Sequence, residues 1–150
     1  MPNSTSGSIR TPHPVPDPRP ARGILDTSVV IDLERIEPAR LPVEVSISAI
    51  TMAELAAGPH ATSDSDEKAR RQDRLQRAEA AFDPIPFDSE AARAYGRIYA
   101  AVVAAGRKAR GARAVDLLLA ATACAAGLPL YTRNPDDFRS IEHLVDIVAV

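Results

Sequence analysis

The feature that most constrains the fold is an alternation, from residue 23 onward, of short apolar runs with longer segments of helical periodicity. The short runs predict strands over residues 23–25, 43–47, 84–87, 128–131 and 144–150. The longer segments predict helices over residues 28–36, 51–57, 67–82, 89–105 and 114–126. Strands that alternate with helices are joined by crossovers and run parallel. The sequence therefore predicts an α/β fold, with about five strands in a mainly parallel sheet and helices on both faces.

Capping signals support two of these helices. Asp88 stands at the expected N-cap of the helix over 89–105, and Gly106 is a suitable stop for it. Gly127, followed by Pro129, ends the helix over 114–126 in the same way. Both helices therefore have sequence-defined boundaries.

Residues 1–21 differ in kind from the rest of the chain. They hold six of the 13 prolines, together with Ser, Thr, Gly and Asn, and they lack an apolar period. This composition predicts a disordered or polyproline-like tail, which leaves residues 22–150 as one folded domain. The single cysteine, Cys124, excludes an intramolecular disulfide, and no apolar run approaches the roughly 20 residues of a membrane span. We expect a cytoplasmic protein that does not associate with membranes.

Acidic residues follow several of the predicted strands. Asp26 comes directly after the first strand, and Glu54 lies one turn into the helix after the second. Asp116 opens the helix that leads to the fourth strand, and Asp136 and Asp137 follow that strand in "TRNPDDF". Ligands of open parallel sheets bind beyond the carboxyl ends of the strands, so these acids are expected at one edge.

Each acid also has an ordinary structural explanation. Asp26 and Asp116 could be helix N-caps, and Glu54 could lie on a solvated helix face. Asp136 and Asp137 could simply form a proline-containing turn. Taken together, acids converging on one edge would repel one another unless a cation lay among them, and Mg²⁺ or Mn²⁺ accepts such oxygen ligands.

With these residues assembled, the chain resembles the PIN-domain ribonucleases, most closely the VapC-type toxins of toxin–antitoxin pairs. The matching segments are "ILDTSVVID", "SAITMAEL" with Gly58, "IPFDSEAARAYGRI" and "DLLLAATACAAGLPLYTRNPDDF", followed by the closing apolar strand. Together they run from about residue 23 to the end of the chain. The resemblance implies a PIN-like three-layer α/β/α fold with the first strand in the middle of the sheet.

The resemblance also implies an activity, a Mg²⁺- or Mn²⁺-dependent endoribonuclease that leaves a 5′-phosphate and a 3′-hydroxyl and inhibits translation and growth. Its four acids correspond to Asp26, Glu54, Asp116 and Asp137, and Asp136 is the less suitable of the last two because Asp137 directly precedes Phe138. Supporting polar residues correspond to Thr27 or Ser28 and to Asn134. The implied partners are RNA, a VapB-type antitoxin whose tail covers the groove near Val29–Ile36 and Glu54, and a second copy in a homodimer.

A basic segment precedes the third acid. Arg107, Lys108, Arg110 and Arg113 lie in "GRKARGAR" with no acid among them, although the net charge of the whole chain is −2. We expect this loop to hold RNA phosphates beside the metal site. The alternative is an exposed arginine-rich loop that keeps the protein in solution or binds an acidic partner.

Other functions remain to be weighed. The leading alternative is a catalytically silent PIN-like module that binds RNA or protein. A phosphoaspartate receiver would need an acceptor Asp ending its third strand, where "PIPFDSE" starts a helix instead. A haloacid-type phosphatase would need an Asp two residues after Asp26, where Ser28 stands.

Overall fold

The centre of the molecule is a sheet of four parallel strands. In a computed structural model that describes Gly7 and residues 9–150, the strands are β1 (Arg22–Leu25), β2 (Glu44–Ser46), β3 (Leu130–Thr132) and β4 (Ile147–Ala149). Their order across the sheet is β2-β1-β3-β4, so β1 is an inner strand as the resemblance implied. In the register between the two inner strands, Ile24 lies opposite Leu130 and Leu25 opposite Tyr131.

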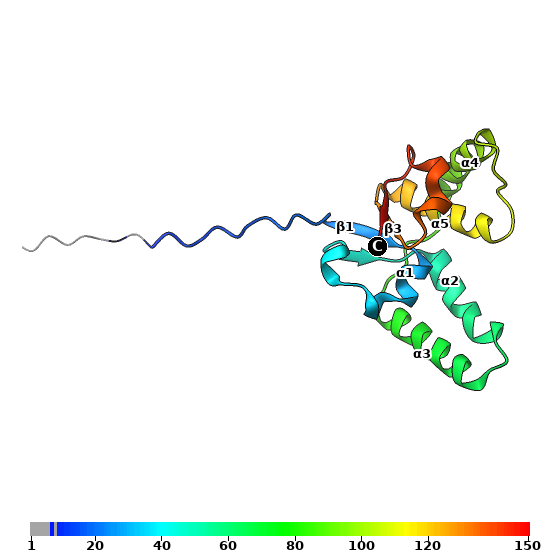
Figure 1. Cartoon of the computed structure of the whole chain (residues 1–150), viewed down its shortest axis with the longest axis horizontal. Helices are drawn as coiled ribbons and strands as arrows, with labels where there is room; N and C mark the ends of the chain where they lie inside the picture. The colour runs from blue at the N-terminus through cyan, green and yellow to red at the C-terminus, as the bar shows by residue number, and fades with distance from the viewer. Residues whose placement is uncertain (1–6, 8) are drawn as a thin grey trace, which may run out of the picture.

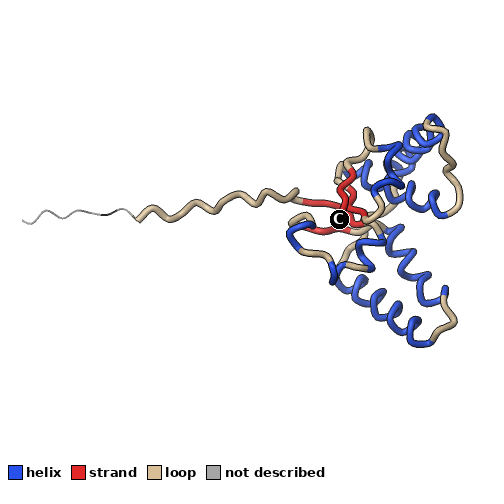
Figure 2. Tube along the Cα trace, viewed as in Figure 1, coloured by secondary structure: helices blue, strands red, loops and turns tan. Residues whose placement is uncertain are grey.

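Helices cover both faces of this sheet (Figures 1 and 2). Side chains alternate between the faces of a strand, and the neighbours Ile24 and Leu25 accordingly belong to two separate apolar clusters. The cluster around Ile24 includes residues of α4 (Ser89–Ala104), α5 (Ala112–Ala126) and the 3₁₀ helix η4 (Pro135–Ile141). The cluster around Leu25 includes residues of α1 (Thr27–Ile31), α2 (Ala49–Ala57) and α3 (Ser65–Ala81). The expected three-layer α/β/α architecture is confirmed.

Three short 3₁₀ helices complete the connections. They are η1 (Leu33–Arg35), η2 (Pro38–Arg40) and η3 (Gly58–Ala61). The helix predicted over 28–36 is therefore divided into α1 and η1. The expected caps are present, because the Asp88 side chain accepts a hydrogen bond from the Ala91 amide and Gly127 ends α5 with a φ of 65°.

The predicted strand over 84–87 is reduced to a single bridge between Ile85 and Ser48. The Ile85 amide donates to the Ile47 carbonyl at 2.9 Å, and the Ala49 amide donates to the Ile85 carbonyl at 2.8 Å. Pro84 and Pro86 on either side have no amide hydrogen to extend this pairing. The sheet thus has four strands and one bridge, where about five strands were expected.

The last two strands begin later than predicted because their first residues complete preceding turns. The Leu128 amide closes the end of α5 by donating to the Ala123 carbonyl at 3.1 Å. The Leu144 and Val145 amides both donate to the Ile141 carbonyl, which keeps them in a turn rather than in β4.

The described part of the predicted tail extends away from the sheet (Figure 1). Residues 9–20 contain neither helix nor strand, and the Arg19 side chain donates to the Pro38 carbonyl at 3.2 Å. Residues 1–6 and 8, which the tail prediction also included, lie outside the described residues. Within the described chain, no helix is both long and apolar enough to cross a membrane.

Candidate active site

Asp26 lies where β1 ends and α1 begins, with only 7% of its surface exposed. Its Oδ1 accepts the Thr27 amide at 2.7 Å, which makes it the N-cap of α1. Its Oδ2 accepts the Thr132 hydroxyl at 2.7 Å and the Ser28 hydroxyl at 3.3 Å. The side chain therefore caps the helix and is also fixed from β3, the neighbouring strand.

Glu54 lies on α2, and its side chain is hydrogen-bonded to Thr27, the residue next to Asp26. Its Oε1 accepts the Thr27 hydroxyl at 2.6 Å. Thr27 has only one hydroxyl proton, so the Thr51 hydroxyl, 3.1 Å away, must be the donor in the contact between the two threonines. The Ser48 hydroxyl in turn donates to Thr51 at 3.4 Å. A buried row of hydroxyl groups thus ends on the Glu54 carboxylate.

Asp116 is half-buried in the first turns of α5, close enough to the other acids for their charges to affect its pKa. Burial is the largest cause of a pKa raised from 3.8 to about 6. The negative charges of the other acids add to it, in the order Asp26, Asp137 and Glu54. The positive charge of Arg113 acts against this increase in the pKa.

Asp137 approaches the site from η4, on the exposed rim. Its amide donates to the Asn134 carbonyl at 3.1 Å, and the next residue, Phe138, is buried in the core. Asp136 instead forms an ion pair with Arg139 at 2.5 Å. The charge of Asp137, and not that of Asp136, contributes to the raised pKa of Asp116.

The four acids that we predicted as site residues therefore come together from four separate segments of the chain. Two of the predicted supporting residues, Thr27 and Ser28, contact the acids directly through their hydroxyls. Asn134 contributes its backbone, since its amide donates to the Thr132 hydroxyl oxygen at 3.0 Å. Sequence reasoning did not single out Ser48 or Thr51, and it placed Thr132 only among the polar residues that follow the predicted strand over 128–131. All three are fully buried polar residues.

The donor set fits a hard divalent cation, because it consists of carboxylate and hydroxyl oxygens. Burial is the largest cause of the raised pKa of Asp116, and repulsion by the other acids adds to it; a cation would relieve that repulsion. Among the described residues, however, no group of three or more His, Cys, Asp or Glu side chains already forms a metal-binding cluster. The acids share one electrostatic environment without forming a closed shell.

The basic loop lies beside these acids. The Arg107 side chain donates to the Asp136 carbonyl at 3.2 Å, next to Asp137. Arg113, at the start of α5, is near enough to Asp116 to act on its pKa. Lys108 and Arg110 are exposed. Positive side chains thus border the acidic site on the side of α5 and η4.

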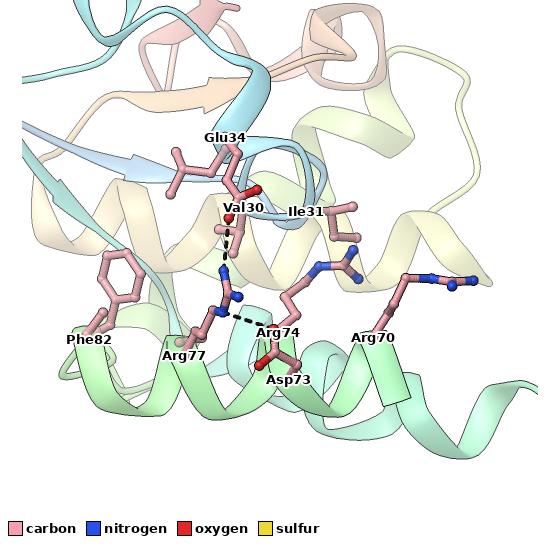
Figure 3. A pocket seen from close by; sticks show the side chains of 11 residues that line it. Val30, Ile31, Glu34, Arg70, Asp73, Arg74, Arg77 and Phe82 are labelled. Atoms are coloured by element: carbon pink, nitrogen blue, oxygen red, sulfur yellow. Dashed lines mark hydrogen bonds and ion pairs between the residues drawn. The ribbon is translucent and has the colours of Figure 1, made fainter. Parts of the chain in front are cut away.

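A separate pocket of about 420 Å³ lies between α1 with η1 on one side and α3 on the other (Figure 3). It includes none of the four acids. Its apolar lining comes from Val30, Ile31, Leu33, Ala78, Ala81 and Phe82. Its charged lining comes from Glu34, Arg70, Asp73, Arg74 and Arg77, and Arg77 forms ion pairs with Glu34 at 3.0 Å and Asp73 at 2.9 Å. The helix facing α1 across this pocket is α3, so the pocket is distinct from the groove expected between α1 and the helix that carries Glu54.

The fold and the site define a class of protein: an α/β domain with a carboxylate site at the carboxyl ends of its inner strands. The chain matches the family model of the PIN domain over residues 23–144. It is 35% identical over 134 residues to Ribonuclease VapC5 of Mycobacterium tuberculosis, covering 87% of this chain and 96% of that protein. It is 30% identical over 126 residues to Ribonuclease VapC of Rickettsia bellii, covering 81% and 91% of the two chains.

A solved structure agrees with these sequence matches. The crystal structure of VapBC-5, a member of the VapBC family of toxin–antitoxin systems from Mycobacterium tuberculosis, superposes with a TM-score of 0.77 at 34% identity. The match covers 87% of this chain and 100% of the compared chain. The chain belongs to the PIN domain family and, within it, to the VapC ribonucleases.

Proposed function

We propose that this chain is the toxin of a toxin–antitoxin pair and an endoribonuclease that hydrolyses RNA phosphodiester bonds with the help of a divalent metal, inhibiting translation and growth. Residues 22–150 are the catalytic domain. The observation that carries the proposal is the arrangement of the acids at the carboxyl ends of the inner strands. Thr132 and Thr27 hold Asp26 and Glu54 there, and the charges of the other acids act on Asp116. Membership of the VapC ribonucleases supports the same activity.

Asp26, Glu54, Asp116 and Asp137 would hold the metal, which we propose to be Mg²⁺ or Mn²⁺ because all four are hard oxygen donors. When bound, such a cation stabilises negative charge on a phosphate and lowers the pKa of water, which is the chemistry that phosphodiester hydrolysis needs. Asp26 is already oriented by Thr27 and Thr132, and Glu54 by the Thr27 hydroxyl. The chain thus orients two of its acids before any ligand binds.

The direct test compares cleavage of a structured RNA by the wild type and by Asp26→Asn and Asp116→Asn, with Mg²⁺ or Mn²⁺ and with EDTA. We expect a loss on the order of a hundred-fold or more in each variant, since each removes a negatively charged oxygen ligand. Equal, metal-independent signals in all three proteins would favour the catalytically silent binding module instead. Sequencing of RNA 5′ ends after brief induction in cells identifies the RNA that is cut.

We propose that the basic loop binds RNA. Arg107 and Arg113 lie against the site, and Lys108 and Arg110 are exposed beside it, so phosphates could be neutralised close to the acids. Replacing Arg107, Lys108 and Arg110 with alanine should lower the slope of log affinity against log salt by up to about 2 for single-stranded RNA. A control with the same loss of charge replaces Arg70, Arg74 and Arg77 on α3. Equal slopes for the two triple variants would contradict this role.

We propose that the pocket between α1 and α3 receives the VapB-type antitoxin, because a lining of both apolar and charged side chains suits an amphipathic partner helix. Ile31, 45% exposed, lines it, whereas Val43, 54% exposed, does not. Ile31→Asp should weaken the complex by about ten-fold or more and leave RNA cleavage intact, with Val43→Asp as the control. Equal antitoxin affinity of the two variants would argue against this surface.

The toxin role has a cellular test as well. Expression should arrest growth, and co-expression of the neighbouring small open reading frame should relieve the arrest. We expect the toxin to act in the cytoplasm as a homodimer, whose mass sedimentation can measure. Growth arrest by the Asp26→Asn variant as strong as by the wild type would contradict a nuclease toxin.

A further inference from the structure

Thr132 and Asp26 lie side by side at the carboxyl ends of the two inner strands. Leu25 pairs with Tyr131 across the two inner strands, so Asp26, directly after β1, and Thr132, the last residue of β3, lie at the same carboxyl edge. Strand side chains alternate, which directs both residues toward the face of Ile24 and Leu130. That face is covered by α5, the helix that carries Asp116. Thr132 thus lies within the acidic site although it carries no charge.

The hydroxyl of Thr132 has a defined direction. Its Oγ1 accepts a hydrogen bond from the Asn134 amide at 3.0 Å. An amide N–H can only donate, so this contact does not use the hydroxyl proton of Thr132. That proton goes to Asp26 Oδ2 at 2.7 Å, across 106 residues of sequence. Thr132 is 0% exposed and Asp26 is 7% exposed, so water competes little for this bond.

The Thr132 hydroxyl is also hydrogen-bonded to the segment that carries Asp137. The Asn134 amide binds Thr132 Oγ1, and the Asn134 carbonyl accepts the Asp137 amide at 3.1 Å. An unbroken series of hydrogen bonds therefore runs from the Asp26 carboxylate through Thr132 and Asn134 to the backbone of Asp137. Each bond involves either a backbone group or a buried hydroxyl.

We infer that Thr132 is a positioning residue, whose hydroxyl fixes the Asp26 carboxylate relative to the segment that carries Asp137. The inference rests on the proposed function for its catalytic consequence, because it concerns two of the proposed metal-holding acids. The Ser28 hydroxyl does not duplicate this role, since it is 3.3 Å from the same oxygen and belongs to the same local turn as Asp26.

The test compares Thr132→Val, which keeps the shape but removes the hydroxyl, with Thr132→Ser, which retains it. Thr122→Val is the matched control, because Thr122 is also buried and its hydroxyl donates to the Leu118 carbonyl of its own helix. Two properties are measured in all four proteins: amide hydrogen exchange of Asn134 and Asp137 by NMR, and Mn²⁺ affinity by calorimetry. Neither property depends on RNA cleavage.

In Thr132→Val, we expect the two amides to exchange roughly five-fold faster or more, because the acceptor of Asn134 is gone. We expect Mn²⁺ affinity to fall by about ten-fold or more, as for other residues that orient a metal ligand. Thr132→Ser should restore both properties, and Thr122→Val should change neither. Unchanged exchange in Thr132→Val, or a loss of Mn²⁺ affinity that serine does not restore, would overturn the inference.

The outcomes separate this inference from the proposed function. If the wild type neither binds Mn²⁺ nor cleaves RNA, the proposed function fails, and amide exchange alone still decides whether Thr132 connects the two segments. If the wild type binds Mn²⁺ and cleaves RNA while Thr132→Val binds Mn²⁺ equally well, the proposed function stands and Thr132 is not a positioning residue.

Discussion

Replacing Asp116 with asparagine should stabilise the metal-free protein at neutral pH and have little effect in acid. The folded-state pKa of Asp116 is about 6, whereas its ordinary value is 3.8. Between these two pH values the folded state holds a proton that the unfolded chain releases. The free energy of unfolding of the wild type therefore falls as pH rises from about 4 to about 6, and the whole cost is present above pH 6. Asparagine is neutral throughout this range and avoids that cost.

The size of the effect follows from the two pKa values. At about 1.36 kcal/mol for each pH unit, the difference between 3.8 and about 6 corresponds to roughly 3 kcal/mol. Asp116 is only half-buried, so water and salt reduce both the cost of burying its charge and the repulsion from the other acids. We therefore expect a stabilisation of about 1 kcal/mol for Asp116→Asn at pH 7.5 and close to zero at pH 4.

The assay is urea unfolding of both proteins in EDTA at several pH values between 4 and 7.5, with the m-value compared at each pH. Glu142→Gln removes an exposed carboxylate at the end of η4 and serves as the control. A difference between Asp116→Asn and the wild type that does not change with pH would refute the reasoning. A wild type more stable than Asp116→Asn at pH 7.5 without metal would also refute the reasoning.

Addition of a divalent metal should make the wild type more stable than Asp116→Asn. A cation at about a hundred times its dissociation constant stabilises the protein that binds it by about 2.7 kcal/mol. The wild type should gain this amount on addition of Mg²⁺ at pH 7.5, whereas Asp116→Asn, with one ligand oxygen neutralised, should gain much less. Equal gains for the two proteins would remove Asp116 from the proposed metal-holding set.

Three further predictions concern two glycines and the hydroxyl row of Ser48, Thr51 and Thr27. Gly23→Ala should lower the free energy of unfolding by about 1 to 3 kcal/mol, because the new Cβ would lie 2.5 Å from Cε2 of the buried Tyr131 ring. Gly96→Ala, on α4 with nothing within 4 Å of the new Cβ, should instead stabilise by up to about 1 kcal/mol in the same urea experiment. Thr27→Val should lower RNA cleavage by about ten-fold because Glu54 loses its hydroxyl donor, and Thr27→Ser should retain most of it. Loss of cleavage in the serine variant equal to that in the valine variant would show that the hydroxyl is not the cause.

The parts of the site that follow a strand were predictable from the sequence. Asp26 and Asp137 follow inner strands, and the parallel arrangement itself brings such residues to one edge. The predicted strand over 84–87 was wrong in extent for a local reason, since its two prolines cannot donate to a ladder and only Ile85 pairs. That error was visible in the sequence, because proline chemistry is a property of the residue.

Other features depend on tertiary contacts that no local pattern encodes. From the sequence, Thr132 is one of several polar residues that follow the predicted strand over 128–131. Its particular role depends on the register that places it beside Asp26, 106 positions away. The pocket between α1 and α3 was not predicted either, because its lining comes from two helices that β2 and α2 separate in the sequence. In both cases the sequence identified the elements and the tertiary arrangement determined their neighbours.

The way the acids are held has a consequence for the proposed chemistry. None of the ion pairs in the described part of the chain uses Asp26, Glu54, Asp116 or Asp137, although arginines are close to the site. Asp26 and Glu54 are instead fixed by threonine hydroxyls, which donate a hydrogen bond without adding charge. A bound arginine would orient a carboxylate equally well, but it would also neutralise it and compete with a cation. Hydroxyl donors leave the negative charge in place, so the same contacts that orient the acids also leave them able to attract a divalent metal.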